Sequence, residues 1–129
     1  MCRENNSFLQ RITQMIKIYK FDEEKVEKAI EEFIKKLSKD ANVLKIVIFG
    51  SFVRGDYAPG SDVDFLIILR NSDKKFVDRI PDFIPQNFPV DVDVFPYTLE
   101  EIEKMKKSGN TFIKRIFKEG KVLFEREIT

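Results

Sequence analysis

The residues of this chain best suited to chemistry are two aspartates and a short glycine- and serine-containing segment just before them. Asp62 and Asp64 are separated by one residue at the start of an apolar run, so strand alternation places both carboxylates on one face with backbones ~6.6 Å apart. Two carboxylates this close repel, and a divalent cation between them removes the repulsion. Upstream, Gly50 permits close backbone approach, Ser51 adds a hydroxyl and Arg54 adds a planar cation, where a strand meets a following helix. The segment predicts a site for a metal ion and a phosphate.

Two better-known loops do not fit this segment. Gly50 and Gly55 have the glycine spacing of a Walker loop, but Asp56-Tyr57 stands where Lys-Ser/Thr is required. A calcium loop needs Asp-x-Asp-x-Asp-Gly, and Asp64 is followed by the apolar Phe65-Leu66-Ile67. A pair of solvated acids at a strand end is the remaining alternative, and the Gly-Ser-x-x-Arg-Gly sequence upstream disfavours it.

The composition narrows the chemistry further. The 129 residues include no histidine and one cysteine, Cys2, which excludes Ser-His and Cys-His nucleophiles and imidazole-ligated metals. A metal must then be a hard ion such as magnesium or manganese, held by carboxylates. The 23 basic and 22 acidic residues balance, so no global field indicates a nucleic-acid binder. No apolar run approaches the ~20 residues that span a bilayer, and the N-terminus lacks the apolar core of a signal peptide. We expect a cytoplasmic protein with no membrane partner.

The pattern of apolar residues predicts a single domain over 1–129 of class α/β (α+β), with a small mixed β-sheet flanked by helices. N-terminal helices are expected over 1–40, the strands that carry the acids over 43–98, and C-terminal helices with a last strand over 98–125. The expected strands are Val43–Phe49, Val63–Leu69, Val90–Phe95 and Lys121–Glu125. The first expected helices are Phe8–Tyr19 and a helix capped by Asp22, with an apolar stripe from Val26 to Leu37. A short helix, Lys74–Ile80, is expected to end near Pro81. The last two expected helices are Thr98–Lys107, which begins with a Thr98/Glu101 capping box, and Thr111–Lys118, which ends at Gly120.

The acidic segment resembles the signature of the polymerase-beta-like nucleotidyltransferase superfamily. That signature is Gly50-Ser51, ten further residues, and Asp62-x-Asp64. The shortness of the chain is similar to that of the minimal, antitoxin-type nucleotidyltransferases. The resemblance is strong from Val43 to about Leu69 and looser through Asp93–Thr98 to the C-terminal helices. It implies a nucleotidyltransferase-like fold over the whole domain, and an enzyme that moves an NMP from an NTP to a hydroxyl and releases pyrophosphate.

The resemblance also implies a third carboxylate on a later strand, for which Asp91 and Asp93 are the candidates. Alternation places both on the same face. We choose Asp93 because family members place this acid just before a short apolar turn into a capped helix, as Val94–Thr98 provides here. Asp91 is kept in reserve.

The roles that the resemblance implies are those of two-metal nucleotidyl transfer. Two magnesium ions, with manganese as the alternative, would be held by Asp62, Asp64 and Asp93, while the phosphates of the nucleotide would lie at Gly50, Ser51 and Arg54. ATP is the first expectation for the nucleotide. The acceptor is left open between a protein side chain, an RNA end, which nothing specifically indicates, and a small molecule. A homo-oligomer also stays open.

A second hypothesis is an antitoxin-like partner of a small helical nuclease toxin, which acts by modification or by stoichiometric binding. A third is a nucleotide sensor without turnover.

Two sets of residues, one basic and one of phenylalanines, each have a structural and a functional interpretation. The basic set suits helix C-termini that complement their dipoles better than a binding face for triphosphate, RNA or an acidic partner. The phenylalanine set suits the packing of a core better than stacking on bases. The sets are Lys104, Lys106, Lys107, Lys114, Arg115, Lys118 and Lys121, and Phe76, Phe83, Phe88, Phe95, Phe112, Phe117 and Phe124.

Overall fold

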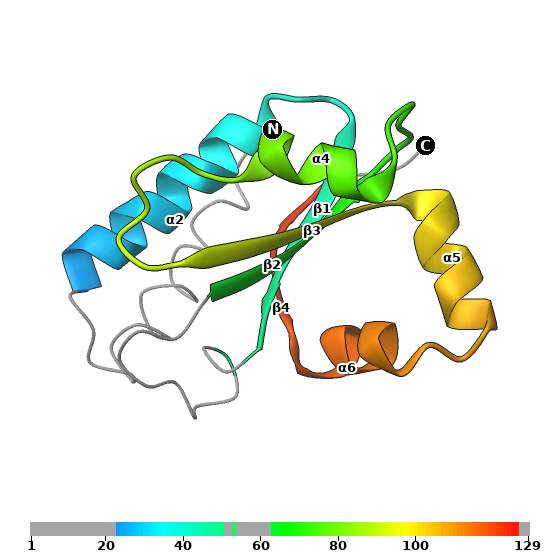
Figure 1. Ribbon diagram of the computed structural model, residues 1–129. Helices are drawn as coiled ribbons and strands as arrows, with labels where there is room; N and C mark the ends of the chain where they lie inside the picture. Colours follow the sequence, from blue (N-terminus) through cyan, green and yellow to red (C-terminus); the bar gives the residue numbers. More distant parts are fainter. Residues whose placement is uncertain (1–22, 51–52, 54–62, 127–129) are drawn as a thin grey trace.

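A four-stranded mixed sheet forms the centre of the computed structural model, which describes residues 23–50, 53 and 63–126 (Figure 1). Its strands are β1 (Val43–Phe49), β2 (Val63–Leu69), β3 (Val92–Thr98) and β4 (Lys121–Glu125), in the order β3-β2-β1-β4. β1 pairs antiparallel with both β2 and β4, whereas β2 and β3 run parallel. The predicted fold class, with its small mixed sheet, is confirmed.

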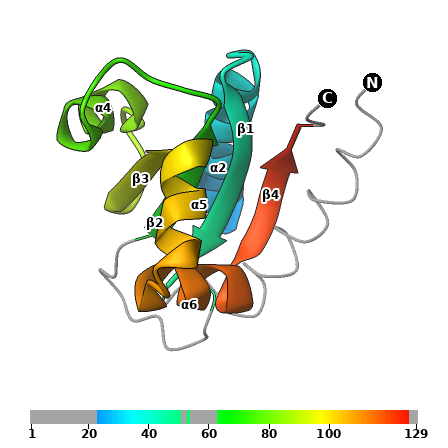
Figure 2. The same ribbon diagram turned by 90° about the vertical axis from the view of Figure 1, so that its right-hand side faces the viewer.

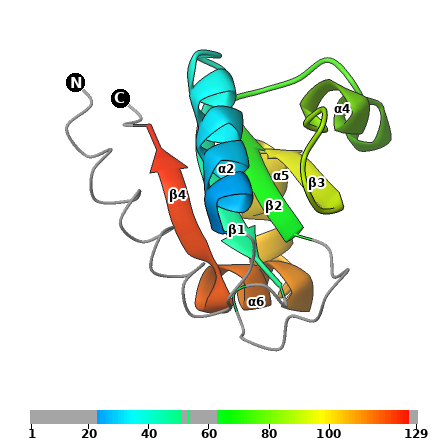
Figure 3. The ribbon, with the colours of Figure 1, turned by 90° about the vertical axis from the view of Figure 1, so that its left-hand side faces the viewer.

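Helices cover both faces of this sheet, so the central strands β1 and β2 are apolar on both sides. On one face lies α2 (Glu23–Ser38), whose buried stripe includes Ile30 and Phe33. On the other lie α5 (Leu99–Lys107) and α6 (Thr111–Glu119). Figures 2 and 3 show α4 (Phe76–Phe83) beyond the β3 edge. In the part of the chain that is described, no helix is long and apolar enough to cross a membrane.

Most of the predicted elements are present. β1, β2 and β4 have the predicted bounds, and the predicted capping box opens α5. There Thr98 Oγ1 accepts from the Glu101 amide at 3.2 Å, and Glu101 Oε1 accepts from the Thr98 amide at 2.9 Å. The expected helix Phe8–Tyr19 and the expected cap Asp22 lie outside the described residues.

The prediction for α4 was wrong at both ends. Lys75 is extended, so the helix begins at Phe76, and it continues through Pro81 to Phe83. Proline removes one backbone donor, but it does not prevent the next turn from closing. The Ile84 amide still donates to Ile80 O at 3.2 Å, and α4 therefore ends after the proline.

The prediction for β3 was displaced by two to three residues. Pairing with β2 runs from Val63 opposite Val92 to Leu69 opposite Thr98, beyond the expected end at Phe95. Pro96 is tolerated inside the strand because β3 is an edge strand with only one neighbour in the sheet. The predicted alternation of faces is correct, since Val94 packs with the α2 face and Phe95 with the opposite face.

Candidate active site

Two of the predicted carboxylates lie side by side at the end of the sheet where β1 ends and β2 and β3 begin. Asp64 is the register partner of Phe49 on one side and of Asp93 on the other. The three residues form one row across three strands, and neighbouring positions in such a row stand about 5 Å apart. Asp64 is half-buried and Asp93 is exposed. Both leave the sheet on the face that α5 and α6 cover, because the next residues along the strands, Phe65 and Val94, pack on the other face.

Gly50 completes this end of β1. Its φ of +93° lies in the region that residues with a side chain rarely adopt. A Cβ at this position would press on Asp64 Oδ2 and lie 3.3 Å from Asp64 Cγ. The carboxylate of Asp64 therefore lies directly over the glycine, in space that any side chain would fill.

The structure brings together three of the residues that the sequence predicted for the site: Gly50, Asp64 and Asp93. Asp62, Ser51 and Arg54 lie outside the described residues. Asp91 is exposed and precedes the first residue of β3, and its carbonyl accepts from the Val63 amide at 2.9 Å. Asp93, and not Asp91, is thus the register partner of Asp64.

The carboxylates fit a hard divalent ion. Asp64 and Asp93 offer oxygen atoms from adjacent strands, and the glycine beside them leaves the Asp64 carboxylate its space. Oxygen is the donor that magnesium and manganese prefer. Among residues 23–50, 53 and 63–126, no three His, Cys, Asp or Glu side chains are grouped as metal ligands. Asp64 and Asp93 would therefore need a further ligand, for which Asp62 is the candidate from the sequence.

A buried arginine, which the sequence analysis missed, holds β3 from its outer side. Arg79 of α4 is 4% exposed, and its Nη1 and Nη2 donate to the two carboxylate oxygens of Glu101 at 2.7 and 2.9 Å. Nη1 also donates to Pro96 O at 2.9 Å, and Nε donates to Lys74 O at 3.0 Å. These contacts tie α4, β3 and α5 together. The residue contacted on β3, Pro96, follows Asp93 by three residues. The available signal was the position of Arg79 three residues after Phe76 and four before Phe83, which places it on the apolar face of this short helix.

The Arg79–Glu101 pair shifts the ionisation of both partners. The hydrogen bonds from Arg79 lower the pKa of Glu101 to about 2, against the opposing effect of burial and with help from the Thr98 amide. The same hydrogen bonds raise the pKa of Arg79 above its usual value. The pair is thus fully charged at neutral pH.

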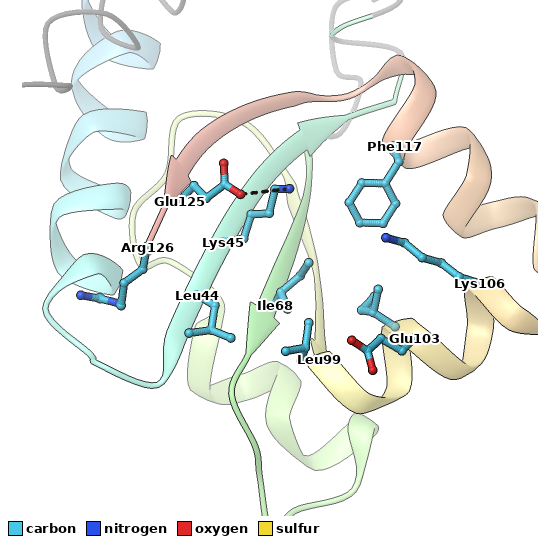
Figure 4. A pocket seen from close by; sticks show the side chains of 10 residues that line it. Leu44, Lys45, Ile68, Leu99, Glu103, Lys106, Phe117, Glu125 and Arg126 are labelled. Atoms are coloured by element: carbon cyan, nitrogen blue, oxygen red, sulfur yellow. Dashed lines mark ion pairs between the residues drawn. The ribbon is translucent and has the colours of Figure 1, made fainter. Parts of the chain in front are cut away.

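Two pockets among the described residues lie away from the carboxylates. One of about 150 Å³ opens between the sheet and helices α5 and α6, at the end of β1 opposite Gly50 (Figure 4). Its cations already have partners, since Lys45 Nζ lies 3.5 Å from Glu125 Oε2 and Lys106 Nζ lies 4.4 Å from the centre of the Phe117 ring. The other, of about 290 Å³, lies between α2 and the segment 84–88. The end of the sheet with Asp64 and Asp93 is therefore the candidate active site.

The mixed sheet thus brings two acidic side chains of adjacent strands together beside a glycine at the end of a central strand. A family model described as "Nucleotidyltransferase domain" matches residues 26–124, and the chain belongs to this family. The resemblance noted from the Gly-Ser and Asp-x-Asp residues is thereby confirmed, and the protein is a nucleotidyltransferase.

Similar proteins support the same assignment. Two proteins of Methanocaldococcus jannaschii, both named as candidate protein adenylyltransferases, are 35% identical over 101 residues and 28% identical over 115 residues. The first match covers 76% of this chain and 97% of the relative, and the second covers 82% and 76%. A crystal structure of a toxin–antitoxin with AMP-PNP has a similar fold, with a TM-score of 0.52 and 15% identity over 78% of this chain and 73% of that one.

Proposed function

We propose that the protein transfers AMP from ATP to a hydroxyl group of a protein, at a site built from Asp62, Asp64 and Asp93. The observation that carries the proposal is the register of β2 and β3, which makes Asp64 and Asp93 neighbours beside Gly50. The names of the two archaeal relatives support adenylyl transfer and a protein acceptor.

In this reaction the acceptor oxygen attacks the α-phosphorus of ATP. The bond from that phosphorus to the bridging oxygen breaks, and pyrophosphate leaves. Asp93, the more exposed of the two described acids, would receive the proton of the acceptor hydroxyl, directly or through water, in a chain that has no histidine.

Asp62 and Asp64 would hold the divalent ions, with Asp93 as the third carboxylate. When bound, magnesium or manganese lowers the pKa of an attacking hydroxyl and neutralises charge on the phosphates. The backbone at Gly50, the Ser51 hydroxyl and the Arg54 guanidinium would hold the leaving phosphates. Most of the catalysis is then positioning and charge stabilisation.

The experiment is transfer of the labelled α-phosphate of ATP to protein, with magnesium. Self-modification and a co-expressed small helical protein are the first acceptors to try. Asp64→Asn and Asp93→Asn should each lower transfer by orders of magnitude, because each removes charge that stabilises the transition state. Asp91→Asn is the matched control from the same face and should cost a few-fold at most. Wild-type transfer by Asp64→Asn would exclude this site, and an inactive Asp91→Asn beside an active Asp93→Asn would move the third carboxylate to Asp91.

A second candidate function is neutralisation of a helical toxin. The similarity in fold to a toxin–antitoxin protein supports it. A variant with Asn at positions 62, 64 and 93 separates the two modes of action. Neutralisation that persists at one-to-one ratio would indicate binding alone, and lost neutralisation would indicate modification.

A further inference from the structure

We propose that the ring of Phe112 stacks on the base of the bound nucleotide and gives the enzyme a preference for purines over pyrimidines. The inference rests on the proposed function, because it takes the phosphates to lie at Gly50 and the metal ion at Asp64. It concerns the other end of the same nucleotide.

Phe112 packs against two phenylalanine rings, Phe49 and Phe95, that neighbour the carboxylates. Its ring centre is 5.8 Å from that of Phe49 and 5.4 Å from that of Phe95. Phe49 directly precedes Gly50 and is the register partner of Asp64. Phe95 follows Asp93 by two residues on the same face of β3. The aromatic ring and the two acids therefore belong to one surface.

The course of α6 explains this placement. The helix crosses the end of the sheet where β1 ends (Figures 2 and 3). Asn110 caps it through a 3.0 Å hydrogen bond from the Ile113 amide to Asn110 Oδ1, while Ile113 and Ile116 are buried against the sheet. Phe112 is thereby held against Phe49 of β1 and Phe95 of β3, while β4 begins shortly after α6 and pairs with β1.

Phe112 also keeps part of its ring available. It is 37% exposed, whereas Phe65 is fully buried. Its contacts with Phe49 and Phe95 are inclined by 79° and 60°, so neither neighbour occupies the parallel arrangement that a base adopts on an aromatic ring. Of the described residues, Val77 is the other large exposed hydrophobic one, at 65%, and it lies on α4.

The chemistry of such a contact defines the ligand. A nucleotide with its phosphates at Gly50, and its metal ion at Asp64, extends its base away from them by the length of one ribose. Stacking tolerates every base and strengthens with the area of the π system. Phe112 should therefore favour ATP and GTP over CTP and UTP, without separating ATP from GTP.

The absence of tryptophan from the sequence provides a direct test. Phe112→Trp introduces a single tryptophan at the proposed contact, and Val77→Trp introduces one on α4 as the control. Addition of ATP with magnesium should quench the fluorescence of the first protein and leave the second unchanged. Inorganic tripolyphosphate with magnesium, which lacks a base, should quench neither. Equal quenching of both proteins, or none at Phe112→Trp, would overturn the assignment.

Binding affinities complete the test. Phe112→Leu should weaken ATP at least about fivefold, the factor that corresponds to the low end of a stacking contact, and leave tripolyphosphate unchanged. Phe112→Tyr should restore ATP binding. A Phe112→Leu protein that binds ATP like the wild type, or loses ATP and tripolyphosphate equally, overturns the role of Phe112 alone. A wild-type protein that binds neither ATP nor tripolyphosphate overturns the proposed function itself and this inference with it.

Discussion

Gly50 is restricted by two independent features of the site. Its backbone has φ +93°, and the carboxylate of Asp64 occupies the space where a Cβ would lie. Gly109 has a comparable φ of +76°, but nothing lies within 4 Å of its Cβ position. The two glycines therefore share the backbone requirement, and of these two only Gly50 lies against a carboxylate.

Gly50→Ala and Gly109→Ala should separate these effects. Each should lose about 1–2 kcal/mol of stability, because alanine is strained at positive φ. Only Gly50→Ala should also displace the Asp64 carboxylate and lose the binding of ATP with magnesium. Urea unfolding measures the first effect and isothermal titration the second. Unimpaired ATP binding by a folded Gly50→Ala would show that Asp64 does not need its observed position.

At the scale of the elements, the Arg79–Glu101 pair joins α4, β3 and α5. Arg79 is buried, and it satisfies two backbone carbonyls as well as the carboxylate. Arg79→Met should leave those carbonyls without donors and cost about 1.5–3 kcal/mol, the range for hydrogen bonds to charged groups. Arg79→Lys should recover little of this stability, because a lysine ammonium cannot bind two carboxylate oxygens and two carbonyls as the planar guanidinium does. Denaturant midpoints measure both losses, and wild-type stability of Arg79→Met would contradict the role.

The ionisation of Glu101 predicts a pH dependence of stability. Its folded pKa, about 2, lies below its ordinary value of 4.5, so the unfolded chain binds the proton more readily. The stabilisation is complete above about pH 4.5 and is lost as the pH falls toward 2. The side chain of Glu101 is 38% exposed, so solvent screening reduces the size of the effect.

Glu101→Gln should therefore lower stability at pH 7 and show a shallower decline between pH 5 and pH 3. Unfolding by urea at a series of pH values measures this slope. Glu103→Gln, an exposed position on the same helix, is the matched control. A wild-type slope in Glu101→Gln would show that other carboxylates cause the acid sensitivity.

Sequence patterns predicted elements well where the signal is local. β1 and β2 are continuous apolar runs, and the Thr98/Glu101 box marks the start of α5. The bounds of β3 depend on its pairing with β2, and the path of α4 depends on the tertiary contacts of Arg79, so neither was available from local pattern. In the same way, the sequence supplied candidate acids for the site, whereas the adjacency of Asp64 and Asp93 came from strand register.

At the scale of the whole molecule, nucleotide binding should be linked to folding. Asp64 and Asp93 come together only when β2 and β3 pair, so the unfolded chain has no assembled site. ATP with magnesium at 100 times its dissociation constant should then stabilise the protein by about 2.7 kcal/mol, seen as a rise in melting temperature. Asp64→Asn should lose this rise and Asp91→Asn should keep it. A rise in Asp64→Asn equal to that of the wild type would place the metal and nucleotide elsewhere.

The strand order also has a consequence for synthesis of the chain on the ribosome. β1 lies between β2 and β4, but β4 follows it by more than seventy residues. At typical elongation rates, the β4-facing edge of β1 stays unpaired for on the order of several seconds before β4 emerges from the exit tunnel. During that interval an apolar strand presents unpaired backbone groups, which is the feature that nascent-chain chaperones protect and aggregation exploits. Synonymous codons that slow translation between β2 and β4 should therefore lower the soluble yield without changing a single amino acid.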